Sequence, residues 1–222
     1  MCSNYVPVTR SDRLLSFFGV HRDARTEPPI DVWPTGLAPF IRLRAPGGDG
    51  RPIERLVDDG HFGLLPPFAT EVAAGRRTYN ARSETVAIKP SFRDAWRRGQ
   101  RCIIPAEGVY EPRYNAQGKA ERWYIHQPGH VPMGLAGIWT QWRDALGNER
   151  LTFAMLTVNA DGHPLYSQFH KPGEEKRMVV ILAPGDYDAW LACPVAEAAR
   201  FLKPWPGELE ASARLLPPRG GA

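Results

Sequence analysis

The sequence predicts an α+β fold, with one domain built on a curled, largely antiparallel, barrel-like β-sheet and short helices at its periphery. The 222 residues suffice for one large domain or two small ones, and no stretch has the composition of a linker. The 22 prolines and 21 glycines are scattered along the chain, which is typical of many turns and few long helices. Four runs rich in aromatic and β-branched residues predict the strands.

Four short segments carry apolar residues at helical spacing and end at turn residues. In the first, Ser11 is a candidate N-terminal cap and Gly19 a stop signal. In the second, Ser91 and Asp94 have the spacing of a capping box. The predicted helices are 11–19, 91–99, 185–192 and 195–202.

The predicted strands are 122–127, 132–142, 151–160 and 177–183. Their continuous apolar character indicates strands buried on both sides, or a closed sheet. The stretch 45–52 has the composition of a loop or hairpin tip. We expect the domain to span residues 1–205 and residues 206–222 to form a partly disordered tail that ends in PPRGGA at 217–222.

Composition restricts the class of protein. The net charge of +4 permits an anionic partner without proving one. The three cysteines, Cys2, Cys102 and Cys193, have neither the number nor the spacing of a disulfide framework or a zinc site. Neither a signal-peptide pattern nor an apolar run of about 18 residues is present. We therefore expect a cytoplasmic monomer that does not contact membranes.

The chain begins Met-Cys, and this start gives Cys2 unusual chemistry if Met1 is removed. Aminopeptidases usually remove a methionine that precedes a residue as small as cysteine. Cys2 would then present a free α-amine and a thiol on adjacent carbons, which places two nucleophiles on one residue. Position alone favours a simpler interpretation, in which Cys2 belongs to a frayed terminus.

The stretch YNARSET (79–85) places Asn80, Arg82 and Glu84 between a Gly-Arg-Arg turn and the helix predicted at 91. The simpler interpretation is a turn in which Asn80 caps the local backbone and the charged side chains face solvent. In a binding site, Arg82 could instead fork onto a phosphate, and Asn80 could orient a carbonyl or an amine.

The stretch CIIPAEGVYEP (102–112) contains a thiol and two carboxyl groups. Cys102 begins an apolar run, so we expect a buried core residue rather than a nucleophile. If 109–111 is extended, Glu111 shares a face with Val109, and a carboxyl group in apolar surroundings suits general acid catalysis. A solvent-exposed carboxylate at Glu107 or Glu111 fits the pattern equally well.

His170 lies in a polar loop before the strand predicted at 177–183 and is followed by Lys171, Lys176 and Arg177. Neighbouring cations favour a neutral imidazole, which can accept a proton as a general base. The alternative is a solvated, charged loop in which His170 has no catalytic role.

The segment HFGLLPPFA (61–69) combines Phe62 and Phe68 with two leucines and two prolines. It is either part of the core or a stiff apolar platform for unpaired bases. Stacking of a base on such a platform contributes about 1–3 kcal/mol.

A resemblance links these stretches. Met-Cys at the start, then NARSET, CIIPAEGVYE and HKPGEEKRM before an apolar strand, follow in this order over roughly residues 2–205. This set resembles the SOS response-associated peptidase (SRAP) family. The resemblance implies the SRAP fold and a protein that recognises abasic sites in single-stranded DNA and cross-links to them through its N-terminal cysteine.

On the matching positions, the resemblance implies that Cys2 forms a thiazolidine with the aldehyde of the abasic site. Glu111 would transfer the proton for ring opening, Asn80 would hold the amine and the sugar oxygen, and His170 would shuttle protons. No metal or other cofactor is implied. The implied site consists of the catalytic residues Cys2, Asn80, Glu111 and His170 and the DNA contacts Arg82, Arg177, Phe62 and Asn4.

Several positions depart from the commoner family pattern. Ser3-Asn4 stands where Gly-Arg is frequent, Phe62 stands where Trp is usual, and Pro112 follows the glutamate where Trp is common. None of these differences removes a reactive group.

The residues leave two other function classes open. An N-terminal-nucleophile amidohydrolase or peptidase would use Cys2 with its own amine as the base, and Asn80 would stabilise an oxyanion. Such a peptidase activity could be limited to removal of Met1, and an abasic-site lyase side activity is a further possibility. A non-enzymatic single-stranded DNA-binding module would use the basic and aromatic surface alone. The change Cys2→Ala separates the enzymes from the binding module, and the cross-linker alone requires an aldehyde.

Overall fold

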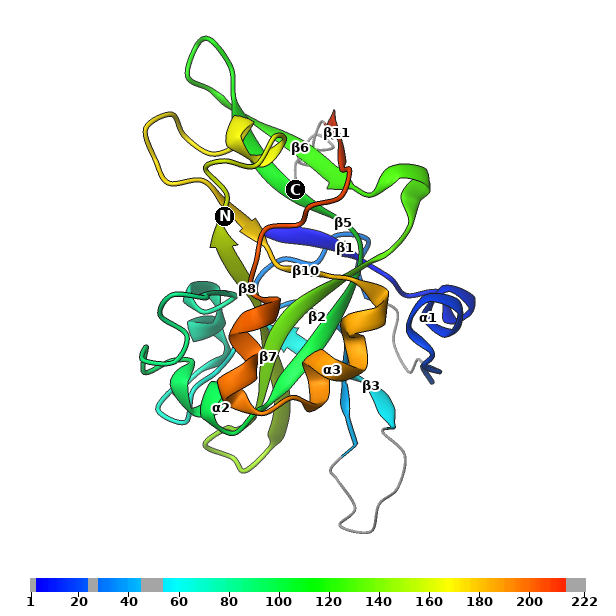
Figure 1. Cartoon of the computed structure of the whole chain (residues 1–222). Helices are drawn as coiled ribbons and strands as arrows, with labels where there is room; N and C mark the ends of the chain where they lie inside the picture. Colours follow the sequence, from blue (N-terminus) through cyan, green and yellow to red (C-terminus); the bar gives the residue numbers. More distant parts are fainter. Residues whose placement is uncertain (1–2, 24–27, 45–53, 215–222) are drawn as a thin grey trace, which may run out of the picture.

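The computed structural model describes residues 3–23, 28–44 and 54–214 (Figure 1). The predicted loop at 45–52, the predicted chain end at 217–222 and Cys2 lie outside these residues. Within them, the helices are too short or too polar to cross a membrane.

Five strands close into a barrel (Figure 1). They are β2 (Leu37–Leu43), β3 (Arg55–Phe62), β5 (Arg101–Tyr114), β7 (Met133–Arg143) and β8 (Glu149–Asn159). The ring runs from β2 through β5, β7, β8 and β3 back to β2. Of these five pairings, β3–β8 is parallel and the others are antiparallel. The predicted barrel-like, largely antiparallel sheet is confirmed, and closure joins edges that an open sheet would expose.

Six further strands extend this sheet. They are β1 (Asn4–Pro7), β4 (Asn80–Arg82), β6 (Ala120–His126), β9 (Arg177–Val179), β10 (Ile181–Leu182) and β11 (Glu210–Ala213). β1 and β6 pair with the second half of β5, β4 and β9 pair with β8, and β10 pairs with β7. β5 therefore continues beyond the barrel into a layer made with β1 and β6.

The helices are short and peripheral, as predicted. They are α1 (Ser11–Phe18), α2 (Arg93–Arg97) and α3 (Tyr187–Ala192), with 3-10 helices η1 (Val72–Arg77), η2 (Pro128–His130), η3 (Tyr166–Gln168), η4 (Pro184–Asp186) and η5 (Val195–Phe201). Gly19 ends α1 with φ of 67°, in the left-handed conformation that glycine favours.

Three details of the helix prediction are wrong. The capping box of Ser91 and Asp94 does not form, because α2 begins after Phe92 without a side-chain cap. Ser11 is likewise not the cap of α1, since Arg10 occupies that position. The segment predicted as a helix at 195–202 is a 3-10 helix, the tighter form common in short connecting pieces.

The C-terminal boundary of the domain lies beyond residue 205. β11 pairs with β6 in antiparallel register, with Glu210 opposite His126 and Ala213 opposite Trp123. Residues 210–213 of the predicted tail therefore form an edge strand. Its weak apolar pattern gave no strand signal, because a short edge strand depends on backbone pairing more than on burial.

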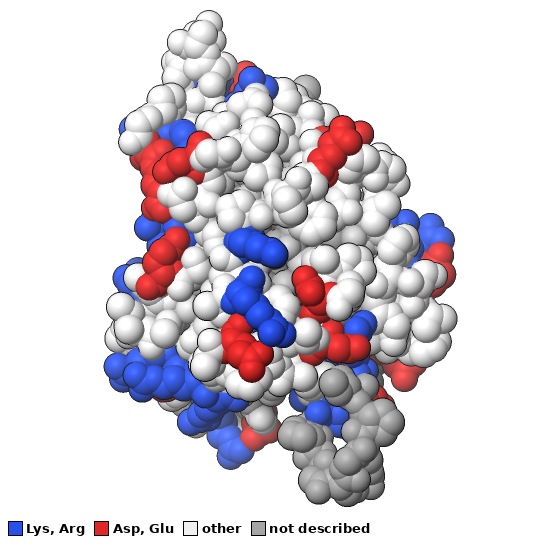
Figure 2. Space-filling model, viewed as in Figure 1, with Lys and Arg blue, Asp and Glu red and all other residues white. Residues whose placement is uncertain are grey.

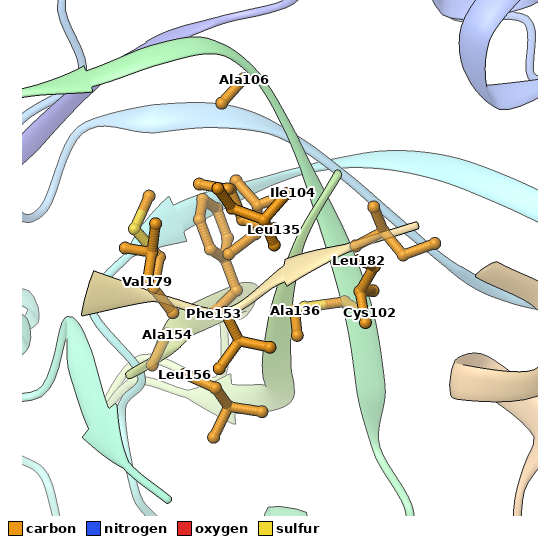
Figure 3. Packing of buried hydrophobic residues seen from close by; sticks show 14 of the residues in the cluster. Cys102, Ile104, Ala106, Leu135, Ala136, Phe153, Ala154, Leu156, Val179 and Leu182 are labelled. Atoms are coloured by element: carbon orange, nitrogen blue, oxygen red, sulfur yellow. The ribbon is translucent and has the colours of Figure 1, made fainter. Parts of the chain in front are cut away.

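Buried apolar side chains pack on both faces of the barrel strands (Figure 3). The side chains labelled there come from β5, β7, β8, β9 and β10 and are Cys102, Ile104, Ala106, Leu135, Ala136, Phe153, Ala154, Leu156, Val179 and Leu182. Cys102 has no exposed surface, and burial raises the pKa of its thiol well above the ordinary value, as expected of a core residue. Gly137 lets two strands approach closely, since a Cβ there would lie 2.8 Å from Cys102 Sγ.

Candidate functional site

A carboxyl group and an imidazole meet in the interior where β5 leaves the barrel. Glu111 lies on β5 opposite Trp123 of β6, with 1% of its surface exposed. His170 is 7% exposed, and its Nε2 lies 2.9 Å from Glu111 Oε2. These two residues are 59 positions apart in the chain and form a buried hydrogen-bonded pair. Such a pair can hold one proton between two groups and pass it on.

The backbone fixes the orientation of His170. Its φ is 62°, a left-handed conformation that is uncommon for a residue with a side chain. The backbone N–H of His170 donates to the carbonyl oxygen of Pro112 at 2.8 Å, which ties the loop to β5 beside Glu111. The backbone N–H of Arg177 lies 3.5 Å from Nδ1 of His170. This contact favours the tautomer with its proton on Nε2, directed at Glu111.

Arg177 is buried among acidic partners. Its guanidinium bonds both carboxylate oxygens of Glu84, at 2.8 and 2.9 Å, and one oxygen of Glu175 at 2.7 Å. It also donates to the carbonyl oxygen of Thr157 at 2.8 Å. The hydrogen bonds from Arg177 hold the pKa values of Glu84 and Glu175 below their ordinary value.

The expected phosphate contact at Arg177 is therefore corrected. Only 2% of this residue is exposed, and two carboxylates already bind its guanidinium. In this structure the Arg177 side chain joins β9 to β8 and to the segment after β4. These contacts fix the position of its own backbone N–H, which contacts His170.

Arg82 differs from Arg177 in its exposure. About half of its side chain is open to solvent, and Nη1 lies 3.0 Å from Glu175. Asn80 lies two positions earlier on β4, so the two side chains share one face of that strand. β4 and β9 both pair with β8, and Thr157 is the β8 residue opposite both Arg82 and Val179. β4, which carries Asn80 and Arg82, and β9, which carries Arg177, therefore both lie next to β8.

A cavity of about 220 Å³ opens beside Glu111. Ser3 and Asn4 line it at the start of the described chain, and Trp33 and Arg122 line it from other segments. Asn4 is buried on β1 opposite Tyr110, so DNA could reach its side chain through the cavity alone. Cys2 lies outside the described residues, but it is bonded to Ser3.

Sequence reasoning missed the wall of this cavity. Trp33 is 46% exposed, and the guanidinium of Arg122 lies 5.9 Å from its ring centroid and 3.2 Å from that of Tyr110. Arg122 also pairs with Asp31 at 2.5 Å. The dipeptide Trp33-Pro34 outside any predicted element was the available signal, because an aromatic residue beside a proline in a loop is often a rigid contact surface.

The expectation that Phe62 offers a stacking surface is also corrected. Its ring has no exposed surface and packs edge-on against Tyr5 and Tyr79 and in a stack with Phe153. A base cannot stack on a ring whose faces are already covered. The exposed aromatic residue of the segment 61–69 is Phe68, with 64% of its surface open.

A family profile described as SOS response associated peptidase (SRAP) matches residues 1–213. This chain belongs to the SRAP family. The match reaches the end of β11, in agreement with the ordered C-terminal strand.

The relatives of this SRAP protein agree with the assignment. It is 33% identical to the abasic site processing protein YobE of Bacillus subtilis over 195 residues, which cover 86% of this chain and 82% of YobE. It is 25% identical to the abasic site processing protein HMCES of Gallus gallus, with 82% of this chain and 60% of HMCES covered.

Solved structures share the fold. A crystal structure of a protein from Bordetella bronchiseptica has a TM-score of 0.85 and 39% sequence identity, and the alignment covers 97% of this chain and all of the other. A second, from Bacteroides thetaiotaomicron, has a TM-score of 0.76 at 23% identity, with 96% of this chain and 91% of the other covered, which shows likeness of fold alone.

Proposed function

We propose that this SRAP protein recognises abasic sites in single-stranded DNA and binds them covalently through Cys2, as a thiazolidine formed after removal of Met1. The observation that carries the proposal is the buried Glu111–His170 pair, whose carboxyl group lines the cavity that Ser3 also lines. Relatives named for abasic site processing support the choice of substrate.

Ring opening is the first step. An abasic sugar is a cyclic hemiacetal, and it opens when the hydroxyl on C1′ loses a proton and the ring oxygen gains one. Glu111 faces the cavity and is hydrogen-bonded to His170, so this pair can take one proton and return another. Glu111 is the group that contacts the sugar in this proposal, and His170 is its proton partner.

The covalent steps use both nucleophiles of Cys2. The free α-amine attacks C1′ of the aldehyde, and loss of one water gives an imine. The thiol then adds to the imine carbon, its proton passes to the nitrogen, and a five-membered thiazolidine closes. Reference pKa values of about 7.7–8.0 for the amine and about 8.5 for the thiol leave a reactive fraction of each near neutral pH.

DNA contacts complete the proposal. Arg82 is open to solvent and can bind a phosphate next to the lesion. Binding should weaken with salt, because bound phosphates release counterions. Single strands are the expected substrate, since an unpaired sugar without a base can turn into a cavity without the opening of a duplex.

The family description favours a second candidate, an N-terminal-nucleophile peptidase. There Cys2 would attack a peptide carbonyl with its own amine as the base, and Asn80 would stabilise the oxyanion. Self-removal of Met1 is the smallest form of this activity. A peptide substrate contains no aldehyde, so the substrate separates the two candidates.

A denaturing gel tests the proposal. The purified protein, with loss of Met1 verified by intact mass, is incubated with a single-stranded oligonucleotide that carries one abasic site. We expect a heat-stable, slower band that requires both the lesion and Cys2. Cys2→Ala should abolish the band, and Cys193→Ala, which removes a buried internal thiol, should retain it.

Cys2→Ser separates the two covalent steps. It keeps the α-amine, so an imine should form that borohydride can trap, but the stable thiazolidine should be lost. Absence of any band from a protein with a verified free Cys2 would reject the cross-linking proposal and leave the peptidase as the better candidate.

A further inference from the structure

A second cavity, of about 560 Å³, lies where β5 begins, between β2, β7 and the end of α3. None of the residues that line it is acidic, and five are arginines: Arg42, Arg44, Arg97, Arg98 and Arg101. Figure 2 shows Lys and Arg side chains gathered at the lower left, where Figure 1 places α2. The cavity thus concentrates positive charge outside the site at Glu111.

Arg101 forms the buried part of this cavity. It is 4% exposed, and it donates from Nε to the carbonyl oxygen of Trp190 at 2.7 Å and from Nη2 to that of Cys193. Its Nη1 is buried and has no hydrogen-bond partner among the described residues. Burial holds the pKa of Arg101 below its ordinary value. Two carbonyl groups do not balance a buried guanidinium, which an anion would stabilise.

The other four arginines fall into two groups. Arg42 pairs with Asp58 and Arg44 with Glu54, each at 2.7 Å. Arg97 and Arg98 are exposed and have no carboxylate partner among the described residues. Arg97 and Arg98 lie at the C-terminal end of α2, but this helix has only five residues, so its dipole neutralises little of their charge. Three guanidinium groups at the cavity are therefore without a counter-charge.

We propose that this cavity binds a doubly charged phosphate group, carried by a small molecule such as a nucleotide or by the phosphorylated end of a DNA strand. A guanidinium presents two parallel N–H donors that match phosphate oxygens. A phosphate monoester carries a charge of about −1.5 to −2 near neutral pH, closer to the three uncompensated cations than the single charge of a carboxylate.

This phosphate site is separate from the candidate cross-linking site. Arg101 and Glu111 are ten positions apart on β5. At about 3.3 Å per residue, this length of strand spans up to roughly 33 Å, and the two cavities share no lining residue. One phosphate group cannot contact both, so phosphate binding is expected without Cys2 and without an abasic site.

Calorimetric titration of the full chain with inorganic phosphate tests the proposal. We expect saturable binding at one site, and we expect Arg97→Gln combined with Arg98→Gln to weaken it by about tenfold or more. The control combines Arg10→Gln with Lys119→Gln, which removes two exposed cations elsewhere and should change the affinity by less than about twofold. Melting curves with phosphate give a second readout, since a ligand of the native state raises Tm.

Two further titrations identify the source of the phosphate. A mononucleotide is compared with inorganic phosphate, and an undamaged oligonucleotide with a 5′-phosphate is compared with the same strand ending in a hydroxyl. If the 5′-phosphate raises the affinity for the oligonucleotide, and this increase requires Arg97 and Arg98, the ligand is the phosphorylated end of a strand. Tight nucleotide binding without that gain assigns a small molecule. No saturable binding by the wild-type chain, or equal loss in both double variants, would overturn the proposal.

Discussion

Two arginine clusters lie near opposite ends of β5, and they differ in how their charge is balanced. At the Glu111 end, Arg177 is enclosed by Glu84, Glu175 and a backbone carbonyl, and these three partners lie within 3 Å. At the other end, Arg101 is buried against two carbonyl groups and has no carboxylate partner among the described residues.

This difference separates two uses of the same side chain. A cation neutralised by its own protein is a rigid support, and here it positions the backbone that contacts His170. A cation without a counter-charge can bind a ligand, because an anion offsets the desolvation free energy of the buried charge. The sequence reads Arg in both places, and the neighbours in space decide the role.

The largest expected effect is on the cross-linking rate and concerns the Glu111 end of β5. Glu111→Gln keeps the shape of the side chain and removes its ionisable proton, so the cross-linking rate should fall by about 100-fold or more. Quenched time courses with abasic single-stranded DNA measure it. Glu121→Gln is the matched control, since Glu121 is exposed on the rim of the same cavity. Equal rates for Glu111→Gln and the wild-type chain would remove Glu111 from the mechanism.

Stability gives the next effect. Glu84→Gln leaves buried Arg177 with one carboxylate, but half of Glu84 is exposed and solvent screens the pair, so we expect a loss of about 1 kcal/mol in the free energy of unfolding. Arg98→Gln, at an unpaired surface cation, should cost less than about 0.5 kcal/mol. Urea unfolding of both variants measures the two losses in free energy of unfolding. A larger loss for Arg98→Gln than for Glu84→Gln would contradict the supporting role of Arg177.

Salt dependence of DNA binding is a smaller effect. Arg82→Gln should reduce the slope of log K against log salt by about 0.7, the value for one phosphate contact on a single strand. Fluorescence anisotropy with abasic DNA and a Cys2→Ala background measures binding without cross-linking. Arg200→Gln, which removes an exposed cation already paired with Glu197, should leave the slope unchanged.

Acid titration gives the smallest effect. The folded-state pKa values of Glu84 and Glu175 are depressed by the hydrogen bonds from Arg177, so their stabilisation is complete above the ordinary carboxyl pKa and is lost as pH falls through the depressed values. Unfolding free energy should therefore decline on acidification, and a Glu84→Gln, Glu175→Gln variant should show a flatter decline. A steeper decline in the variant would contradict the assignment.

Only part of the sheet could be predicted from local signals, because the barrel strands β2, β3 and β5 were not among the predicted strands. Apolar runs gave strands at 122–127, 132–142 and 151–160 within two residues of β6, β7 and β8. The strand at 177–183 is interrupted at Val180, whose N–H bonds Leu156 of β8 and whose carbonyl accepts from Ala136 of β7. A strand that passes between two partners has no local signature.

The candidate site was less accessible to sequence reasoning. Residue chemistry named Glu111 and His170 as candidates, the family resemblance chose them over the alternatives, and their contact across 59 residues came from the fold. Whether Phe62 faced the core or solvent was undecided, because an apolar segment supports both. The pairing of Arg177 with Glu84 spans 93 positions, and nothing in either local sequence specifies it.

The measurement that most directly tests the central claim is the intact mass of the product formed with abasic single-stranded DNA, followed by peptide mapping. The proposal predicts a mass equal to the chain without Met1 plus the oligonucleotide minus one water, with the modification on the peptide that begins at Cys2. An adduct on a lysine, or on a chain that retains Met1, would contradict it.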